Sequence, residues 1–282
     1  MHGVKYVVAV TVFACLGMDT SGAAANEPPS LRTNSCEDAD HVNWVPGEYL
    51  CFAIKTFVPD EKVARPILRI FLHGDVSRGG PGDYMYRYAR RSHRYAAGRS
   101  SSIVSVALLR PSYYDKEGRQ STPGNSGRRG TKYPEDVDSI ASAVRALSKH
   151  HNASRVVLIG HSGGAQISAV ILGRYPGLAQ AALLAACPCD LRARAIRRNR
   201  RVGRALDPMD YVNDIPRTTR IIAMTGARDT NTIASECEPY IARLKTRGVS
   251  ARLELIERAK HGFRRLARSS VYKEGLAELD KE

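Results

Sequence analysis

A strand-like run, a glycine-rich turn and a helix-like run follow one another without interruption between residues 155 and 173. Arg155–Ile159 (RVVLI) has the length and β-branched content of a strand buried on both faces. Ala165–Gly173 (AQISAVILG) is typical of a buried helix, and Gly160–Gly164 (GHSGG) lies between the two runs. Glycines allow a turn too sharp for bulkier residues, so this segment predicts a strand-to-helix turn with Ser162 exposed at its tip.

The rest of the chain repeats this alternation of strand and helix patterns. Pro134–Lys149 predicts a helix, because proline and two acids open it and apolar residues recur at helical spacing. Such alternation predicts an α/β fold with a mostly parallel central sheet and helices on both faces. The other expected strands are Glu48–Val58, Ile67–Leu72, Ile103–Leu109, Ala181–Cys187, Arg220–Thr225 and Ala251–Ile256, and the other expected helices are Asp83–Ala97 and Ile233–Arg247.

The N-terminus has the pattern of a secretory leader. Lys5 supplies a positive start, Tyr6–Gly17 an apolar run, and Ala23–Ala25 a small-residue cleavage site. The run is short for a membrane span. Cys15 raises the alternative of a lipoprotein, which Phe13 disfavours. We therefore expect residues 1–25 to be a signal peptide, residues 26–282 to be one catalytic domain, and the protein to be exported to a periplasm or secreted.

Cysteine usage is compatible with an oxidising compartment. Cys36 and Cys51 flank a short segment and are a candidate disulfide pair. Cys237 has two candidate partners, Cys187 and Cys189, and sequence alone does not choose between them. The C-x-C spacing differs from redox C-x-x-C motifs, so a structural role is favoured. No H-E-x-x-H or similar spacing occurs, and we expect neither a metal nor a cofactor.

The chain is strongly basic, with 43 Lys and Arg against 28 Asp and Glu and a net charge of +15. Such a charge attracts anionic substrates or an anionic envelope surface, although solvated arginines are the simpler explanation. Aromatic residues are not interleaved with the basic ones, so no nucleic-acid partner is expected. Nothing in the sequence indicates the oligomeric state.

Ser162 needs a base, because a serine hydroxyl is a weak nucleophile at neutral pH. In a nucleophile-elbow protein the acid and the histidine follow the serine in that order. Asp229 ends the segment that begins with the Arg220–Thr225 strand, and His261 lies just past the last strand. We expect His261 to take the proton of Ser162 and Asp229 to orient His261, with Glu257 as the fallback acid.

Acyl transfer also needs two hydrogen-bond donors for the oxyanion. The backbone N–H of Gly163, directly after the nucleophile, is one candidate. The second should lie in the loop after Ile67–Leu72, where Asp75 is the first choice and Val76 the second. The long loop that starts at residue 110 follows another strand, and we expect three of its side chains to bind substrate: Arg110, Tyr113 and Tyr114.

From Ile67 to Phe263 the chain resembles the α/β-hydrolase superfamily, in its single-domain esterase, dienelactone-hydrolase and prolyl-oligopeptidase-like branches. The matching motifs are His73-Gly74, Gly160-His161-Ser162-Gly163-Gly164, Gly226-x-x-Asp229 and His261-Gly262-Phe263. Asp75 stands where lipases with an HGGG loop have glycine, which argues against a lipase. The resemblance implies an α/β-hydrolase fold with a small Arg-rich insertion, Asp190–Pro216, after the sixth strand, long enough to form a small lid.

These observations predict an exported serine hydrolase that cleaves a carboxylic ester or a short peptide or amide through an acyl-enzyme. The insertion arginines suggest an anionic substrate or an anionic surface nearby. Two alternatives share the fold: a non-catalytic protein that binds envelope polymers, and an acyltransferase with the same triad. The complete Ser–Asp–His set disfavours the binding protein, which needs none of the three.

Overall fold

The computed structural model describes residues 31–60, 63–76, 80–97, 103–124, 130 and 132–281. The side chains of residues 94–97 are not part of this description. The predicted signal peptide lies outside the described residues. No helix in the described part of the chain is both long and apolar enough to cross a lipid bilayer.

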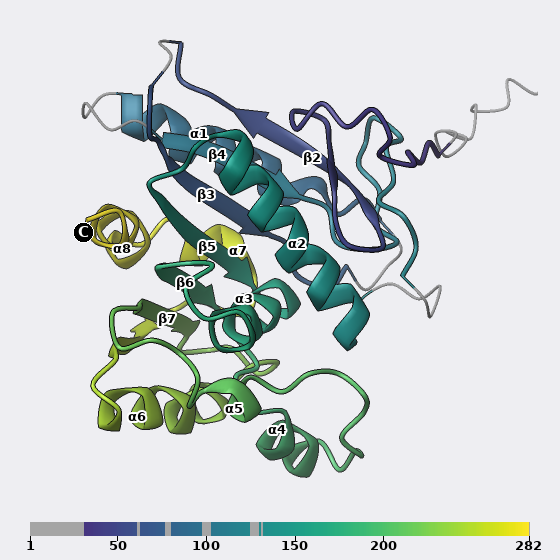
Figure 1. The fold of residues 1–282 in the computed structure, drawn as a ribbon. Helices are drawn as coiled ribbons and strands as arrows, with labels where there is room; N and C mark the ends of the chain where they lie inside the picture. Colours follow the sequence, from purple (N-terminus) through teal and green to yellow (C-terminus); the bar gives the residue numbers. More distant parts are fainter. Residues whose placement is uncertain are drawn as a thin grey trace, which may run out of the picture.

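Eight strands form one sheet in the order β1-β2-β4-β3-β5-β6-β7-β8 (Figure 1). The strands from β3 to β8 run parallel, whereas β1 and β2 add to one edge in antiparallel fashion. This is the predicted α/β-hydrolase arrangement. The strands are β1 (Trp44–Pro46), β2 (Cys51–Phe57), β3 (Ile67–Leu72), β4 (Ile103–Leu108), β5 (Arg155–His161), β6 (Ala181–Ala185), β7 (Arg220–Gly226) and β8 (Ser250–Ile256).

Helices cover both faces of the sheet. Alternate residues of each strand point to opposite faces, so the central strands contribute to two separate apolar cores. One core contains residues of α2, α3 and α6, and the other contains residues of α1, α7 and α8. The helices are α1 (Tyr86–Ala97), α2 (Pro134–His150), α3 (Gly163–Arg174), α4 (Leu191–Arg197), α5 (Pro208–Tyr211), α6 (Glu238–Thr246), α7 (Phe263–Leu266) and α8 (Ser270–Leu279), with short 3-10 turns at Asp83–Met85 and Ala234–Glu236.

The elements match the predicted ones closely, with a few differences. The expected helix over Ile233–Arg247 is a 3-10 turn followed by α6. The insertion after β6 holds α4 and α5, both short. Neither β1 nor the two C-terminal helices, α7 and α8, was predicted. Strand β1 has only three residues and exists through its pairing with β2.

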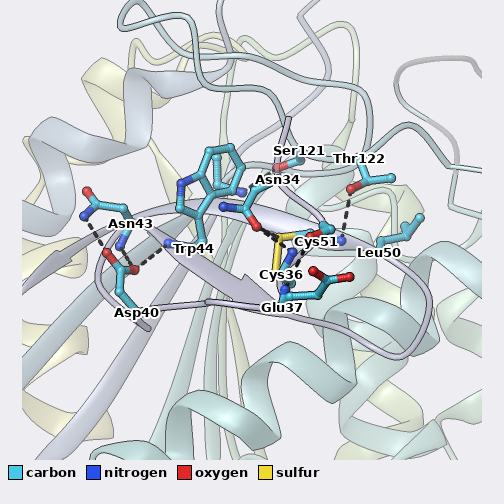
Figure 2. Close-up of a disulfide and its surroundings, with 12 residues drawn as sticks. Asn34, Cys36, Glu37, Asp40, Asn43, Trp44, Leu50, Cys51, Ser121 and Thr122 are labelled. Atoms are coloured by element: carbon cyan, nitrogen blue, oxygen red, sulfur yellow. Dashed lines mark hydrogen bonds between the residues drawn. A yellow bond between two sulfur atoms is a disulfide. The ribbon is translucent and has the colours of Figure 1, made fainter. Parts of the chain in front are cut away.

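Two disulfides lie in the described residues. Cys36–Cys51 ties the entry segment to β2, beside Asn34 and Thr122 (Figure 2). Cys189–Cys237 joins the start of the insertion to α6, which resolves the choice that the sequence left open. Cys187 is a buried free thiol, and the sulfurs of these last three cysteines lie within 4.8 Å of one another. Metal binding needs thiolates, and a disulfide provides none.

Candidate active site

The turn between β5 and α3 has the sharp geometry that the sequence predicts. Ser162 adopts φ 52° and ψ −118°, which is strained for a residue with a side chain. A Cβ on Gly160 would lie 2.4 Å from the Cα of Ala165, and one on Gly164 would lie 2.2 Å from the carbonyl oxygen of Leu72. Only glycine fits at these two positions, and the tight turn lifts Ser162 out of the strand.

The structure brings Ser162, His261 and Asp229 together. His261 Nε2 is 3.0 Å from Ser162 Oγ, and His261 Nδ1 is 2.9 Å from Asp229 Oδ2. Each residue follows the carboxyl end of a parallel strand, β5, β7 or β8. These ends meet at one edge of the sheet, which is why residues far apart in the sequence converge.

Asp229 is held by several donors. Its side chain is fully buried, and it accepts hydrogen bonds from the N–H groups of Asn231 (2.8 Å) and Thr232 (3.0 Å) and from the Thr232 hydroxyl (2.8 Å). Burial raises the pKa of Asp229, but the hydrogen bonds from His261 and Thr232 outweigh it and lower the pKa to about 2. Asp229 is therefore ionised at any pH near neutrality.

His161, within the glycine-rich turn, contacts the backbone of His261 with one ring nitrogen and Tyr84 with the other. Its Nε2 lies 2.9 Å from the carbonyl oxygen of His261, and its Nδ1 lies 2.6 Å from the Tyr84 hydroxyl. The Tyr84 oxygen in turn accepts the N–H of Gly74 at 2.5 Å. Burial lowers the pKa of His161 to about 4, so the ring is neutral and donates through Nε2. The motif shows His161 in the sequence, but nothing there indicates its partner Tyr84.

The loop after β3 lies beside the nucleophile. A Cβ on Gly74 would come within 2.9 Å of the Ser162 Cβ. The N–H of Gly74 donates to Tyr84, and the N–H of Val76 donates to the Tyr113 hydroxyl at 3.4 Å. Among the described residues, the N–H groups of Asp75 and Gly163 have no protein acceptor. The two first-choice oxyanion donors are thus the ones left available.

The Asp75 side chain forms an ion-pair cluster next to Gly163. Its carboxylate binds Arg110 Nη1 at 2.8 Å and Lys132 Nζ at 2.7 Å. A Cβ on Gly163 would lie 2.6 Å from Asp75 Oδ1, so the cluster adjoins the nucleophile. Burial raises the pKa of Asp75, but Arg110 and Lys132 outweigh it and hold that pKa well below its ordinary value. Sequence reasoning missed Lys132, because it lies 57 residues from Asp75.

The three side chains predicted to bind substrate differ in their exposure. Arg110 is fully buried, and Tyr113 is 1% exposed with its ring packed edge-on against His73. Tyr114 is half-buried. Arg110 and Tyr113 therefore form the wall beneath the site in this structure, and Asp75, with a 46% exposed side chain, is the group that faces solvent.

Two arginines of α4 are held by ion pairs, whereas the Arg192 side chain is 57% exposed. Arg194 and Arg197 both pair with the buried carboxylate of Glu236. Arg194, Arg197 and Arg198 also donate to the carbonyl oxygen of Asn231. Because Asn231 donates to Asp229, these contacts fasten the insertion to the loop that carries the acid.

A family model described as the prolyl oligopeptidase family matches residues 117–277 of this chain. The match covers more than half of the sequence and includes Ser162, Asp229 and His261. The chain belongs to the prolyl oligopeptidase family. It is accordingly a serine hydrolase, an esterase or a peptidase. No curated protein matches this chain.

Solved structures of esterases and peptidases share the fold. Est1E from Butyrivibrio proteoclasticus, with ferulic acid bound, superposes with a TM-score of 0.61 at 13% identity, over 84% of this chain and 99% of its own. Acylaminoacyl peptidase from Pyrococcus horikoshii gives 0.64 at 13% identity, over 84% of this chain but 40% of its own. Esterase 2 from Thermogutta terrifontis, phosphonylated by cyclosarin, gives 0.56 at 20% identity, over 90% and 92% of the two chains.

Proposed function

We propose that this family member cleaves a carboxylic ester or a short peptide or amide through a covalent acyl-enzyme on Ser162. The observation that carries the proposal is the continuous chain of contacts from Ser162 Oγ through His261 to the buried carboxylate of Asp229. A serine on a strained turn, in contact with a histidine whose other nitrogen faces an ionised acid, is equipped for nucleophilic attack.

The proton transfers follow from the same contacts. His261 Nε2 takes the proton of Ser162 as Oγ attacks the substrate carbonyl, and later gives it to the leaving group. Asp229 accepts from Nδ1–H, which fixes the tautomer with Nε2 free to act as base. A water molecule then enters on the vacated side, and His261 activates it to release the acyl group from Ser162.

For the oxyanion, we propose the N–H groups of Gly163 and Asp75. Gly163 opens α3, so its N–H is one of the helix donors that no residue of the helix can satisfy. The carboxylate of Asp75 would repel a developing negative charge if it were alone. Arg110 and Lys132 compensate it and leave the cluster with a net charge of +1.

This cluster also bears on the substrate. A net positive charge beside the nucleophile favours neutral or anionic acyl groups over cationic ones. We expect Tyr114 and the exposed part of the Asp75 side chain to contact the substrate. The buried side chains of Arg110 and Tyr113 should hold this part of the site in place without touching the substrate. Comparing kcat/KM for p-nitrophenyl esters of butyrate, hemisuccinate and 4-aminobutyrate checks this, and the aminobutyrate ester should be the poorest substrate.

We further propose that the enzyme is exported, to the periplasm or beyond. The signal-peptide pattern of residues 1–25 supports export. The two disulfides add support, because disulfides persist in oxidising compartments and are rare in the cytosol. The mass of the exported protein, measured by mass spectrometry, would test whether the mature chain begins near residue 26.

Labelling with a fluorophosphonate probe tests the catalytic proposal. The wild-type protein should be labelled, whereas Ser162→Ala and His261→Ala should not. Ser270→Ala, at an exposed serine of α8, is the matched control and should be labelled as the wild type is. A folded wild-type protein that resists the probe would favour the polymer-binding alternative. Labelling without net hydrolysis, but with acyl transfer to an added alcohol or amine, would favour the acyltransferase.

A further inference from the structure

A cavity of about 580 Å³ lies between α1 and α8, and its lining includes none of the three residues Ser162, Asp229 and His261. Its floor includes Ile67 and Ile103, the first residues of β3 and β4. Ser162 follows the carboxyl end of β5, whereas the cavity lies at the amino ends of β3 and β4, so the two sites are at opposite ends of the parallel strands. The volume falls within the range of small-molecule sites, about 300–1,000 Å³.

A buried arginine forms the polar part of the floor. Arg69 is in the middle of β3, on the face where its neighbours Ile67 and Phe71 are apolar. Its side chain is 5% exposed and pairs with Asp280, just beyond the last turn of α8. It also donates to the backbone carbonyl of Ser92 in α1 at 3.4 Å. A charge inside a central strand is costly, and here it joins the two helices that form the cavity walls.

Tyr272 of α8 has a buried hydroxyl group that is not satisfied by a hydrogen bond to a described residue. The residue is 7% exposed and lines the cavity, with its ring packed edge-on against Phe263. A buried donor without an acceptor costs about 1–3 kcal/mol, and a ligand oxygen in the cavity would remove that cost.

Positively charged side chains surround the opening. Four exposed cations belong to the lining, and none of them forms an ion pair with a described residue. The wall beneath them is apolar and includes Leu276 and Ala277 of α8. An apolar cavity under a cationic rim is complementary to a molecule with an apolar chain and an anionic head. The four cations are Arg91, Arg268, Lys273 and Lys281.

We propose that the cavity between α1 and α8 binds a free single-chain anionic amphiphile of the fatty-acid type. The chain lies against the apolar wall, the rim cations neutralise the head, and the Tyr272 hydroxyl donates a hydrogen bond to a head oxygen. The site is separate from Ser162 and does not depend on the hydrolytic activity. Occupancy would bridge α1 and α8 and stabilise the C-terminal helix against the sheet.

Calorimetric titration of the Ser162→Ala protein with dodecanoate tests the proposal, because this variant excludes turnover as a source of heat. We expect saturable binding of one dodecanoate per chain below its micellar concentration. Dodecanol, which keeps the chain and lacks the charge, should bind more weakly, and dodecyltrimethylammonium should not bind. Tyr272→Phe should weaken dodecanoate binding several-fold, to about a fifth of its affinity.

Two further variants separate the cavity from the overall charge. Ala277→Trp fills the cavity and should abolish binding. Charge reversal at Arg268 and Lys273 (Arg268→Glu with Lys273→Glu) should weaken binding at least about fivefold. The same reversal on α6, at the far face of the sheet (Arg243→Glu with Lys245→Glu), changes the net charge equally and should leave binding intact.

Several outcomes would overturn the proposal. Absence of dodecanoate binding is one, and equal binding by Ala277→Trp is another. Equal binding of dodecyltrimethylammonium would show an unspecific apolar surface. Binding to phosphatidylglycerol vesicles but not to dodecanoate would make this face a membrane contact instead. Each cavity variant is also made with Ser162 intact. Fluorophosphonate labelling of that protein shows that the variant is folded, so loss of binding cannot be mistaken for unfolding.

Discussion

At the scale of single residues, an aspartate beside the nucleophile is the feature that most needs a physical explanation. Asp75 occupies a position where a negative charge opposes the negative charge of an oxyanion. Arg110 and Lys132 hold its carboxylate on both oxygens, at 2.8 and 2.7 Å. The Arg110 side chain is fully buried, whereas the Lys132 side chain is 11% exposed. Lys132 is therefore the partner whose replacement disturbs the packing less. The proposed oxyanion position therefore tolerates Asp75 because Arg110 and Lys132 compensate its negative charge.

Lys132→Met tests this compensation. Removing the ammonium group leaves more of the Asp75 charge next to the proposed oxyanion position, and we expect kcat to fall about tenfold with little change in KM. The double variant Asp75→Asn with Lys132→Met removes both charges and should recover most of the loss. Steady-state kinetics on a p-nitrophenyl ester provides the measurement. A double variant no better than Lys132→Met would show that the lysine acts in some other way.

At the scale of elements, α4 is the part of the insertion that bears on catalysis. Arg194 and Arg197 meet on Glu236, whose side chain is 2% exposed, and they also reach the loop of Asn231. A buried carboxylate with two guanidinium partners resists opening, because separation would leave it unpaired. The insertion is thus fastened at its first helix and is not free to swing as a whole.

Replacing both arginines should expose this role. Arg194→Ala with Arg197→Ala leaves Glu236 buried and unpaired, which should cost about 3 kcal/mol of stability and lower kcat by displacing the Asp229 loop. Arg200→Ala with Arg201→Ala removes the same charge from exposed positions that form no ion pair with a described residue, and should change the melting temperature little. Equal melting temperatures for the two double variants would contradict the inference that Arg194 and Arg197 fasten the insertion through Glu236. A rise in KM for anionic esters in the Arg200/Arg201 variant alone would support steering of substrate by the exposed arginines.

The second disulfide stabilises the same region by a different means. Cys189 and Cys237 close a loop across 48 residues and join the insertion to α6. Disulfides typically contribute about 2–4 kcal/mol by constraining the unfolded chain. Cys189→Ala with Cys237→Ala should therefore lower the melting temperature by about 5–15 °C in calorimetry. An unchanged melting temperature would show that the cross-link adds nothing to the packing around it.

Local sequence patterns predicted the strands β2 to β8, the longer helices α1, α2 and α3, and the triad residues, because these depend on short-range information. Ser162, Asp229 and His261 each follow a strand that an apolar run predicts, and strand ends meet by topology. Long-range pairings left no local signal: Lys132 reaches Asp75, and Arg69 reaches Asp280 from 211 residues away. The helix α8 escaped prediction because Gly275 interrupts its helical pattern, yet that glycine sits tightly against Ile222 and admits α8 to the sheet.

At the scale of the whole molecule, the cysteine count connects structure with export. The chain has six cysteines, and four form the two disulfides, which leaves Cys15 and the buried Cys187. Burial raises the pKa of Cys187 well above its ordinary value, so it should be inert in the native state. Thiol titration under non-reducing conditions should find none in folded mature protein and one after unfolding. Two thiols after unfolding would mean that the segment with Cys15 remains attached.

Stability should also fall in mild acid, because two buried histidines are neutral in the folded state. His73 accepts the N–H of Arg110 at one nitrogen and faces the Gly74 carbonyl with the other, and His161 is placed similarly between Tyr84 and His261. Burial lowers the pKa of His73 to about 3 and that of His161 to about 4. Both values lie below that of an unfolded histidine, about 6.5, so the unfolded chain binds more protons between these limits. Stability is therefore highest near neutrality and declines as the pH falls below about 6.5.

Each of these histidines should remove about 2 kcal/mol of unfolding free energy between pH 7 and pH 5. Asp229 acts in the same direction at lower pH: its lowered pKa contributes stability that is present above about pH 4 and is lost as the pH falls toward 2. Urea unfolding at the two pH values measures the histidine effect. His161→Phe should be less stable at neutral pH, because it loses the contacts to Tyr84 and His261, but its stability should depend less on pH by about 2 kcal/mol. An equal pH dependence in both proteins would mean that His161 is not held neutral by the fold, and the proposed support of His261 through a neutral His161 would fail with it.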